Sequence, residues 1–287
     1  MAFRDHVKYY ILVTDMVTNY GHMTRNISTR MAPVLERLEL ERPELVTASY
    51  LASILEEAGI KSPAKVVAAR LRDRGWLLET GQRGVWEFAP AEVAGPYSSF
   101  DPLLPFASMK AAHPEAECAL TMQTAAWALG VADRVPARIE AAFADGIPTW
   151  KTPSGVRALS FRSNLPLATA KGSPCLAPEA IVVHMAAKPS AVRSWSGALE
   201  WLPDVTCEMN VDKAIEELGG RPSSVAARTG YLLQGMRPDI AEAIRKAYPP
   251  SAKNRFGPRG AAVRNDERWK ISDTLLPFDP AELEDAR

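Results

Sequence analysis

A cluster of basic side chains is the part of this sequence whose chemistry is easiest to name. Residues 61–83 contain six lysines and arginines but only two acidic residues, in a chain of 287 residues whose formal net charge is zero. Ammonium and guanidinium groups neutralise backbone phosphates and release counterions, which makes such binding depend on salt. The cluster therefore predicts a surface for the phosphate backbone of a nucleic acid. Its basic members are Lys61, Lys65, Arg70, Arg72, Arg74 and Arg83.

Two capped helices joined by a tight turn are expected to position this cluster. Thr47 can cap a first helix, whose apolar side chains recur at helical spacing until Gly59 ends it. After a short turn, Ser62 is the expected N-cap of a second helix. Pro63 suits the first position of that helix, because its missing N–H costs nothing there. Gly75 ends the second helix.

A small hairpin follows the second helix. The runs 76–78 and 85–88 are apolar and contain aromatic residues, and they flank a turn bounded by glycines. Helix, turn, helix and hairpin in this order indicate a winged helix-turn-helix, which predicts binding to DNA. A supporting helix is expected before these elements, starting at Asn26 or Ser28.

The second helix divides into a packing stripe and an outward face that is mostly basic. Base edges are read mainly from the N-terminal turns of such a helix, whereas cations at its end and on the wing contact phosphates. The expected base-reading residues are Lys61, Ser62, Lys65, Val66 and Ala69. The expected phosphate contacts are Arg70, Arg72, Arg74 and Arg83. Two alternatives stay open: the solvated face of an ordinary helical hairpin, and a winged helix that binds protein.

The length of the chain favours two domains. The first is expected over residues 23–90. Residues 1–22 have no assignment, and a strand, a helix or an arm for dimerisation are all open for them. The segment 91–105 concentrates Pro, Gly and Ser and is the expected linker, so residues 106–287 form the second domain.

The second domain mixes helix and strand patterns. The predicted fold class is therefore α+β, with an N-terminal winged helix-turn-helix followed by a larger mixed α/β domain. Residues 249–287 are expected to be mostly irregular. Helices are expected over residues 103–112, 116–129, 178–188, 211–218, 223–234 and 238–248, the fifth capped by Ser223 or Ser224. Strands of a small sheet are expected over residues 138–143 and 156–161.

A second positive zone lies towards the end of the chain. Residues 221–270 carry 11 basic and four acidic side chains. This zone is a candidate for a second contact with DNA or with a partner, and a merely solvated face is the alternative. The candidate contacts are Arg245, Lys246, Lys253, Arg255, Arg259, Arg264 and Arg268.

Catalytic chemistry has little support in this sequence. It lacks a Gly-rich phosphate loop with its lysine, a G-x-S-x-G elbow and an H-E-x-x-H motif. His184 lies in an apolar run, where a hydrogen-bonded core residue is expected rather than a base. Cys118, Cys175 and Cys207 are odd in number and lack a C-x-x-C spacing, so we expect reduced packing residues. No catalytic residue, metal site or cofactor is predicted, and an enzyme is not expected.

The apolar pattern of the sequence predicts the cellular compartment of the protein. No run of 18 apolar residues occurs, and the N-terminus lacks the pattern of a signal peptide. We therefore expect a cytoplasmic protein without a membrane partner.

Two motifs in the second domain resemble a known family. The block 176–183, LAPEAIVV, and the block 228–234, RTGYLLQ, are similar to the PERALLD-like and RLGYLLE-like motifs of AbiEi-family antitoxins. Arg is absent after Pro178-Glu179, and Thr and Gln stand where the second motif has Leu and Glu. The resemblance spans about residues 28–250, and it is strongest to mycobacterial two-domain members.

This resemblance implies an antitoxin of a two-gene toxin-antitoxin system, of the type called type IV. In such systems the N-terminal domain binds inverted repeats in the promoter of its own operon and represses it. The C-terminal domain counters a nucleotidyltransferase-like toxin, with or without direct contact, and a homodimer on DNA is compatible with inverted repeats. The positive zone could then meet either DNA or an acidic toxin surface.

Two other classes of function remain to be distinguished. One is a one-component transcription factor whose second domain binds a small ligand or dimerises. The other is a nucleic-acid-processing enzyme that uses the winged helix for targeting. A neighbouring nucleotidyltransferase gene favours the antitoxin, ligand-dependent release from DNA favours the transcription factor, and metal-dependent cleavage favours the enzyme.

Overall fold

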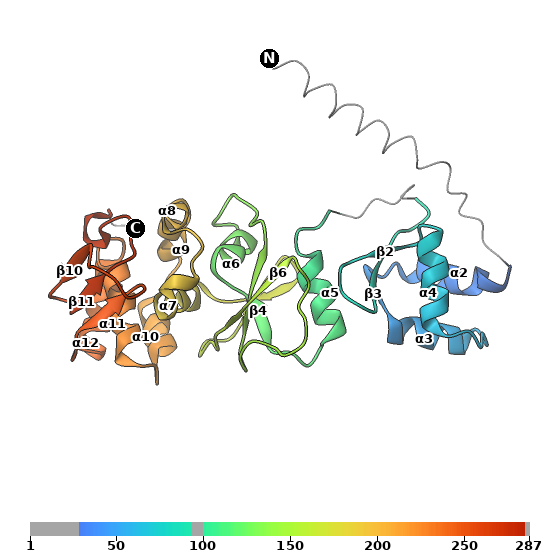
Figure 1. Cartoon of the computed structure of the whole chain (residues 1–287), viewed down its shortest axis with the longest axis horizontal. Coiled ribbons are helices and arrows are strands. Elements are labelled where there is room, and N and C mark those ends of the chain that lie inside the picture. The colour runs from blue at the N-terminus through green and yellow to red at the C-terminus, as the bar shows by residue number, and fades with distance from the viewer. Residues whose placement is uncertain (1–28, 93–99, 285–287) are drawn as a thin grey trace, which may run out of the picture. The chain divides into compact units, whose positions relative to one another are not determined.

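The computed structural model describes residues 29–92 and 100–284, which divide into two compact units (Figure 1). The first unit extends to Leu104 and includes Ser108–Pro114, and the second holds Pro105–Ala107 and the chain from Glu115 onwards. Helix α5 (Leu104–Ala112) thus belongs partly to each. The unassigned segment 1–22, the helix starts at Asn26 and Ser28 and part of the expected linker 91–105 lie outside the described residues.

The first unit has the element order of a winged helix-turn-helix. A 3-10 turn and three helices surround a three-stranded antiparallel sheet with the order β1-β3-β2. The strand β1, which precedes the first helix of the motif, adds a third strand to the predicted hairpin. The elements are η1 (Thr29–Met31), α2 (Ala32–Glu41), β1 (Leu45–Thr47), α3 (Ala48–Glu57), α4 (Ala64–Asp73), β2 (Leu77–Glu79) and β3 (Val85–Phe88).

The core of this unit forms where the apolar stripes of its helices meet. Leu38 of α2, Leu51 of α3 and Val67 of α4 have no exposed surface. Trp76 and Phe88 close the core from the hairpin. Burying a large apolar side chain contributes roughly 1.5–3 kcal/mol, so this cluster is what fixes the helices relative to the sheet.

The ends of α3 follow the prediction, and the start of α4 differs by one residue. Thr47 Oγ1 accepts a hydrogen bond from the Tyr50 N–H at 3.1 Å, and Gly59 adopts φ +65°. Ser62 makes no capping hydrogen bond, and Pro63 is itself the N-cap. With ψ at 137°, Pro63 is extended, and its carbonyl accepts the first helical N–H groups, those of Val66 and Val67.

A mixed five-stranded sheet begins the second unit. Its strand order is β6-β5-β4-β8-β7. The two predicted strands are confirmed as β5 and β6, but the helix expected over residues 116–129 is wrong in its first part. Residues 118–120 form the central strand β4, all three buried, and α6 starts only at Met122. The bounds are β4 (Cys118–Leu120), α6 (Met122–Leu129), β5 (Ile139–Phe143), β6 (Val156–Ser160), β7 (Ala168–Ala170) and β8 (Ser173–Cys175).

Helices make up the middle of the second unit. The helix α7 is buried from Glu179 to Ala186 and packs against α6, α10 and α11 (Figure 1). The start predicted for α11 is late by one or two residues, because Pro222, rather than Ser223 or Ser224, is its N-cap and Ser223 is its first residue. The bounds are α7 (Pro178–Ala187), η2 (Pro189–Ala191), α8 (Trp195–Ala198), α9 (Leu202–Cys207), α10 (Val211–Leu218), α11 (Ser223–Leu233) and α12 (Pro238–Ala247).

The segment expected to be irregular contains a small sheet. Strand β11 lies between β9 and β10, pairing parallel with the first and antiparallel with the second. The sheet packs on α11, and the 3-10 turn η3 follows. The bounds are β9 (Asn254–Phe256), β10 (Arg264–Asp266), β11 (Ile271–Asp273) and η3 (Pro280–Glu282). The α+β fold class is confirmed.

Candidate nucleic-acid interface

The outward face of α4 carries the side chains that the sequence assigned to base reading. Lys65, Val66 and Arg70 are exposed, whereas Val67 and Leu71 on the opposite side are buried. Ala69 is half-buried. The helical period therefore separates the two faces as expected, and it exposes the outward side of the first two turns of α4 to solvent.

A hollow of about 520 Å³ lies between α4 and the hairpin. Lys65, Ala69 and Arg72 line it from the helix, and Gln82 and Arg83 from the turn between β2 and β3. Gln82 was not among the predicted contacts. Its place inside the turn between two glycines was the signal that could have identified it, because side chains at a wing tip project away from the sheet.

The tip of the hairpin is held in one conformation by its own contacts. Gly81 and Gly84 both have φ +79°, an angle that residues other than glycine rarely adopt. Thr80 Oγ1 donates to the Val85 carbonyl at 2.9 Å and accepts from the Gln82 N–H at 3.3 Å. A turn fixed in this way presents the Arg83 side chain at a defined place beside α4.

Most of the predicted cations are unpaired within the unit. Arg72 is the exception, because its guanidinium forms an ion pair with Glu79 of β2. This contact joins α4 to the hairpin, so the side chain of Arg72 holds the hairpin in position. The side chains without an ion pair or hydrogen bond to another described residue are those of Lys61, Lys65, Arg70, Arg74 and Arg83.

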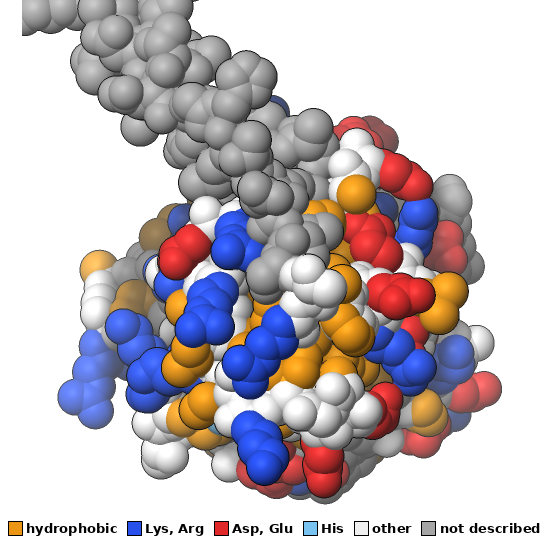
Figure 2. Space-filling view, turned by 90° about the vertical axis from the view of Figure 1, so that its right-hand side faces the viewer, with side chains coloured by type: hydrophobic (Ala, Val, Ile, Leu, Met, Phe, Trp, Pro, Cys, Tyr) orange, Lys and Arg blue, Asp and Glu red, His pale blue; other side chains and the backbone are white. Residues whose placement is uncertain are grey.

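The charge of the first unit is divided between its elements. Figure 2 shows Lys and Arg side chains gathered on the left of one face and most Asp and Glu side chains on its right. Residues 32–57, which span α2 and α3, contain six acidic and two basic residues. Both of these arginines form ion pairs, Arg37 with Glu41 and Arg42 with Glu92. Unneutralised positive charge is thus concentrated on α4 and the hairpin.

The second positive zone does not form a single free face. Arg245 and Arg268 both contact Glu242 of α12. Arg264 is half-buried and pairs with Asp273 at 2.9 Å, so it stabilises the small sheet. The candidate contacts that remain exposed without an ion pair among the described residues are Lys246, Lys253, Arg255 and Arg259.

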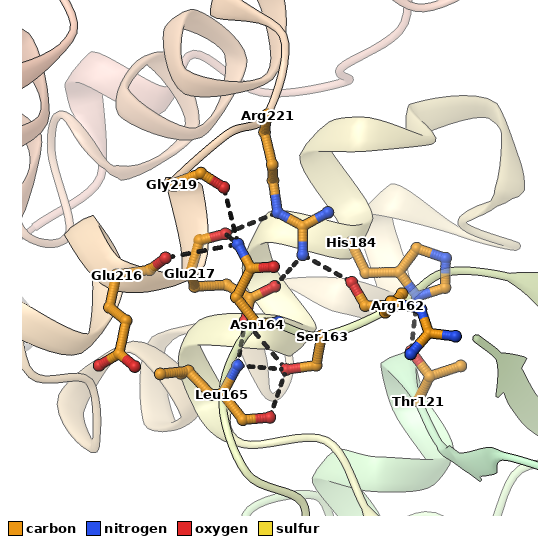
Figure 3. Close-up of polar contacts among 10 residues, drawn as sticks. All are labelled: Thr121, Arg162, Ser163, Asn164, Leu165, His184, Glu216, Glu217, Gly219 and Arg221. Atoms are coloured by element: carbon orange, nitrogen blue, oxygen red, sulfur yellow. Dashed lines mark hydrogen bonds and ion pairs between the residues drawn. The ribbon is translucent and has the colours of Figure 1, made fainter. Parts of the chain in front are cut away.

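His184 is a core residue, as the sequence predicted. Its ring is fully buried, stacks on Phe161 with centroids 4.2 Å apart, and shares a hydrogen bond with Thr121 Oγ1 at 2.7 Å (Figure 3). Burial lowers the pKa of His184 to about 3, helped by the nearby positive charges of Lys188 and Arg221. The imidazole is therefore neutral at physiological pH.

The three cysteines differ in their surroundings. Cys118 and Cys175 are buried, as expected for packing residues, but Cys207 at the end of α9 is exposed. Burial raises the pKa of the Cys175 thiol to about 12. Among residues 29–92 and 100–284, no group of three or more His, Cys, Asp or Glu side chains could hold a metal ion. No helix in that part of the chain is long and apolar enough to cross a membrane.

A buried carboxylate joins the sheet of the second unit to its helices. Glu217 of α10 is fully buried and accepts hydrogen bonds from Ser163 Oγ and from the Asn164 and Leu165 N–H groups, at 2.9 to 3.1 Å. Arg221 forms an ion pair with Glu217 (Figure 3). Its guanidinium also lies over the ring of Phe161, 4.4 Å from the ring centroid. The loop after β6 is thus held against the turn between α10 and α11.

The RTGYLLQ motif holds the small C-terminal sheet. Gly230 lies directly against the indole of Trp269, whose Nε1 donates to Gln234 Oε1 at 3.1 Å. Tyr231 Oη donates to Asp273 Oδ2 at 3.0 Å. Arg228 Nε donates to the Arg255 carbonyl at 2.7 Å. The motif therefore holds β9, β11 and the turn between β10 and β11 against α11.

The LAPEAIVV motif starts a helix that is buried on all sides. Glu179, in the first turn of α7, accepts a hydrogen bond from the Asn210 N–H at 2.8 Å. Asn210 in turn caps α10 with its side chain. The motif therefore links the beginnings of two helices.

These two motifs lie inside a segment that matches a known family. Residues 118–235 match the family described as the AbiEi antitoxin C-terminal domain. This segment is therefore similar to AbiEi antitoxin C-terminal domains. The resemblance drawn from the two motifs is thereby confirmed, and the matched segment, here called the AbiEi domain, contains the strands β4 to β8 and the helices α6 to α11.

The chain is also similar to a solved structure over most of its length. The crystal structure of the RV2827C protein from Mycobacterium tuberculosis superposes with a TM-score of 0.71 at 27% sequence identity. The similarity covers 88% of this chain and 94% of that one, so it includes elements before the AbiEi domain. A search of curated proteins finds no match.

Proposed function

We propose that this chain is a DNA-binding antitoxin that represses its own toxin-antitoxin operon and counters a nucleotidyltransferase-like toxin. The first activity belongs to the winged helix-turn-helix and the second to the AbiEi domain. The observation that carries the proposal is the unpaired positive face of α4 and the hairpin, in the same chain as an AbiEi antitoxin domain. We further propose that the chain acts in the cytoplasm and needs no catalytic residue.

The exposed face suits the major groove of DNA. The outward side of the first two turns of α4 presents Lys65, Val66 and Ala69 to base edges, while the inward side packs in the core. Arg70, Arg74 and Arg83 lie near the end of the helix and on the wing, where phosphates pass. Most acidic residues of the unit lie on α2 and α3 rather than on α4. Their repulsion of DNA phosphates therefore acts away from the proposed contact surface.

Four exposed cations that follow the AbiEi domain have a smaller part in this proposal. Lys246, Lys253, Arg255 and Arg259 lie in the second unit and are available for DNA or for an acidic surface of the toxin. Two bound copies on inverted repeats would double the number of phosphate contacts without a new surface on either chain.

The experiment that tests the proposal separates repression from toxin neutralisation. The full chain is co-expressed with the adjacent gene, and growth and promoter activity are measured in the same cells. Lys65 and Arg70 are replaced together by alanine, and Lys151 and Lys213, two exposed cations of the second unit, are replaced as a charge-matched control.

We expect the Lys65→Ala, Arg70→Ala variant to lose repression while it still restores growth. The control variant should retain both activities. If the wild-type chain fails to restore growth, the antitoxin role is contradicted. Promoter activity that stays low with the double variant would contradict the role of α4.

A further inference from the structure

Val66 is a branched apolar side chain on the outward face of α4. It is 43% exposed, whereas Val67 and Leu71 of the same helix are 0% and 2% exposed. A β-branched residue lowers helix propensity, and an exposed one gains little from burial, so Val66 adds little to the stability of this unit. Its position on the outward face leaves Val66 accessible to a contact made outside the unit.

The charges around Val66 restrict what this contact can be. Lys65 precedes it and Arg70 follows one turn later, and neither side chain has an ion pair or hydrogen bond with the described residues. A ligand that covers Val66 must therefore supply negative charge on both sides and an apolar group in between. A DNA duplex supplies phosphates at the groove edges and, in the major groove, the C5-methyl group of thymine.

The helix geometry fits two successive base steps. Val66 and Ala69 are three residues apart, which is about 4.5 Å along the helix axis. This spacing is close to the rise of about 3.4 Å between base pairs. Valine has one strongly preferred χ1 rotamer in a helix, so its methyl groups are held in place before binding.

We propose that α4 reads the C5-methyl group of a thymine through Val66, with Ala69 packing on the next base step. The inference rests on the proposed function and names the base feature that gives it sequence preference. Lys65 faces the hollow beside the wing and donates to the adjacent base or phosphate, while Val66 selects against base pairs without the methyl group.

The test removes the methyl group from the DNA. The full chain is first footprinted on the promoter of the gene that encodes it. Duplexes are then made in which each thymine of the footprint is replaced singly by uracil, which pairs identically but lacks the C5-methyl group. We expect uracil to weaken binding about fourfold at one thymine or at two adjacent ones. This factor corresponds to about 0.8 kcal/mol, the free energy of burying one methyl group.

Variants of Val66 connect the effect to this side chain. Val66→Ala should bind the unmodified operator about fourfold more weakly, and uracil at the sensitive position should cause no further loss. Val66→Thr keeps the branched shape if the alanine variant folds poorly, and it should show a reduced sensitivity to uracil. Val263→Ala, a change at an exposed valine of the second unit, is the matched control and should bind as the wild type does.

Three results would overturn the inference in distinguishable ways. A wild-type chain that prefers the promoter over a scrambled duplex but tolerates uracil everywhere leaves the proposed function intact and refutes thymine reading. Val66→Ala that binds DNA normally but fails to restore growth with the toxin assigns Val66 to a protein contact. A wild-type chain without preference for the promoter refutes both proposals.

Discussion

The contact between Gly230 and Trp269 gives the sharpest prediction for stability. A Cβ atom at position 230 would lie 2.0 to 2.6 Å from three carbon atoms of the indole, far closer than real carbon contacts allow. Trp269 has no exposed surface, and hydrogen bonds from its Nε1 and its backbone N–H hold it in place. We expect Gly230→Ala to force either the indole or α11 to move.

The size of the effect follows from opposing contributions. Overpacking costs about 1–3 kcal/mol, and losing a hydrogen bond of the displaced indole costs about 1 kcal/mol more. Alanine gains about 0.5–1 kcal/mol over glycine inside a helix. The free energy of unfolding should therefore fall by about 1–3.5 kcal/mol, and expulsion of the indole from the core would raise the loss to about 4 kcal/mol.

Urea unfolding of the full chain, followed by circular dichroism, measures this loss in the transition of the second unit. Gly260→Ala is the control, because a Cβ there meets nothing within 4 Å. Trp269→Leu should lower the free energy of unfolding less in the Gly230→Ala variant than in the wild type, because the smaller side chain relieves the clash. An unfolding free energy of Gly230→Ala that equals or exceeds the wild-type value would refute the close contact.

The remaining predictions concern charge. Lys65→Ala with Arg70→Ala should abolish promoter preference at unchanged thermal stability, and any residual binding should show a log–log salt slope smaller by about one, measured by fluorescence anisotropy. Arg264→Ala should lower the unfolding free energy by about 2–4 kcal/mol, because it leaves the buried carboxylate of Asp273 without its cation, whereas Arg259→Ala should stay within about 0.5 kcal/mol. The neutral state of His184 stabilises the fold above pH 6.5, and this contribution is lost as the pH falls from 6.5 towards 3, because the unfolded imidazole takes up a proton that the buried one refuses. Urea titrations of the wild type and His184→Gln between pH 7 and pH 4 should therefore show a smaller decline for the variant, and equal declines would contradict the low pKa.

Local signals were enough to predict the winged helix-turn-helix. Thr47 marks the start of α3 through its side-chain hydroxyl, and Gly59 and Gly75 mark helix ends through their positive φ angles. The apolar period of α4 determines which side chains face outward. The outward position of Lys65, Val66 and Arg70 was therefore predictable. What these side chains bind stays a prediction, because exposure alone does not identify a ligand.

Long-range pairing explains the parts that the sequence could not predict. The strand β4 has only three residues, and its identity depends on β5 and β8 lying on either side of it. The pairing of Ile271 with Asn254 likewise joins segments that have no local strand pattern. The ion pairs of Arg72 and Arg264 depend on tertiary position in the same way, so cations that look equivalent in the sequence have different roles.

The packing of the C-terminal strands on α11 sets an order of folding events during synthesis. Residue Phe88 completes the sheet of the first unit, and Asp273, the partner of Tyr231, leaves the ribosome 185 residues later. At translation rates of about 5–20 residues per second, that interval is about 10–40 s. Each new molecule therefore carries a finished first unit before the strands that close its second unit have been made. Under the proposed function, a nascent chain near its own promoter could bind DNA before it could counter a toxin.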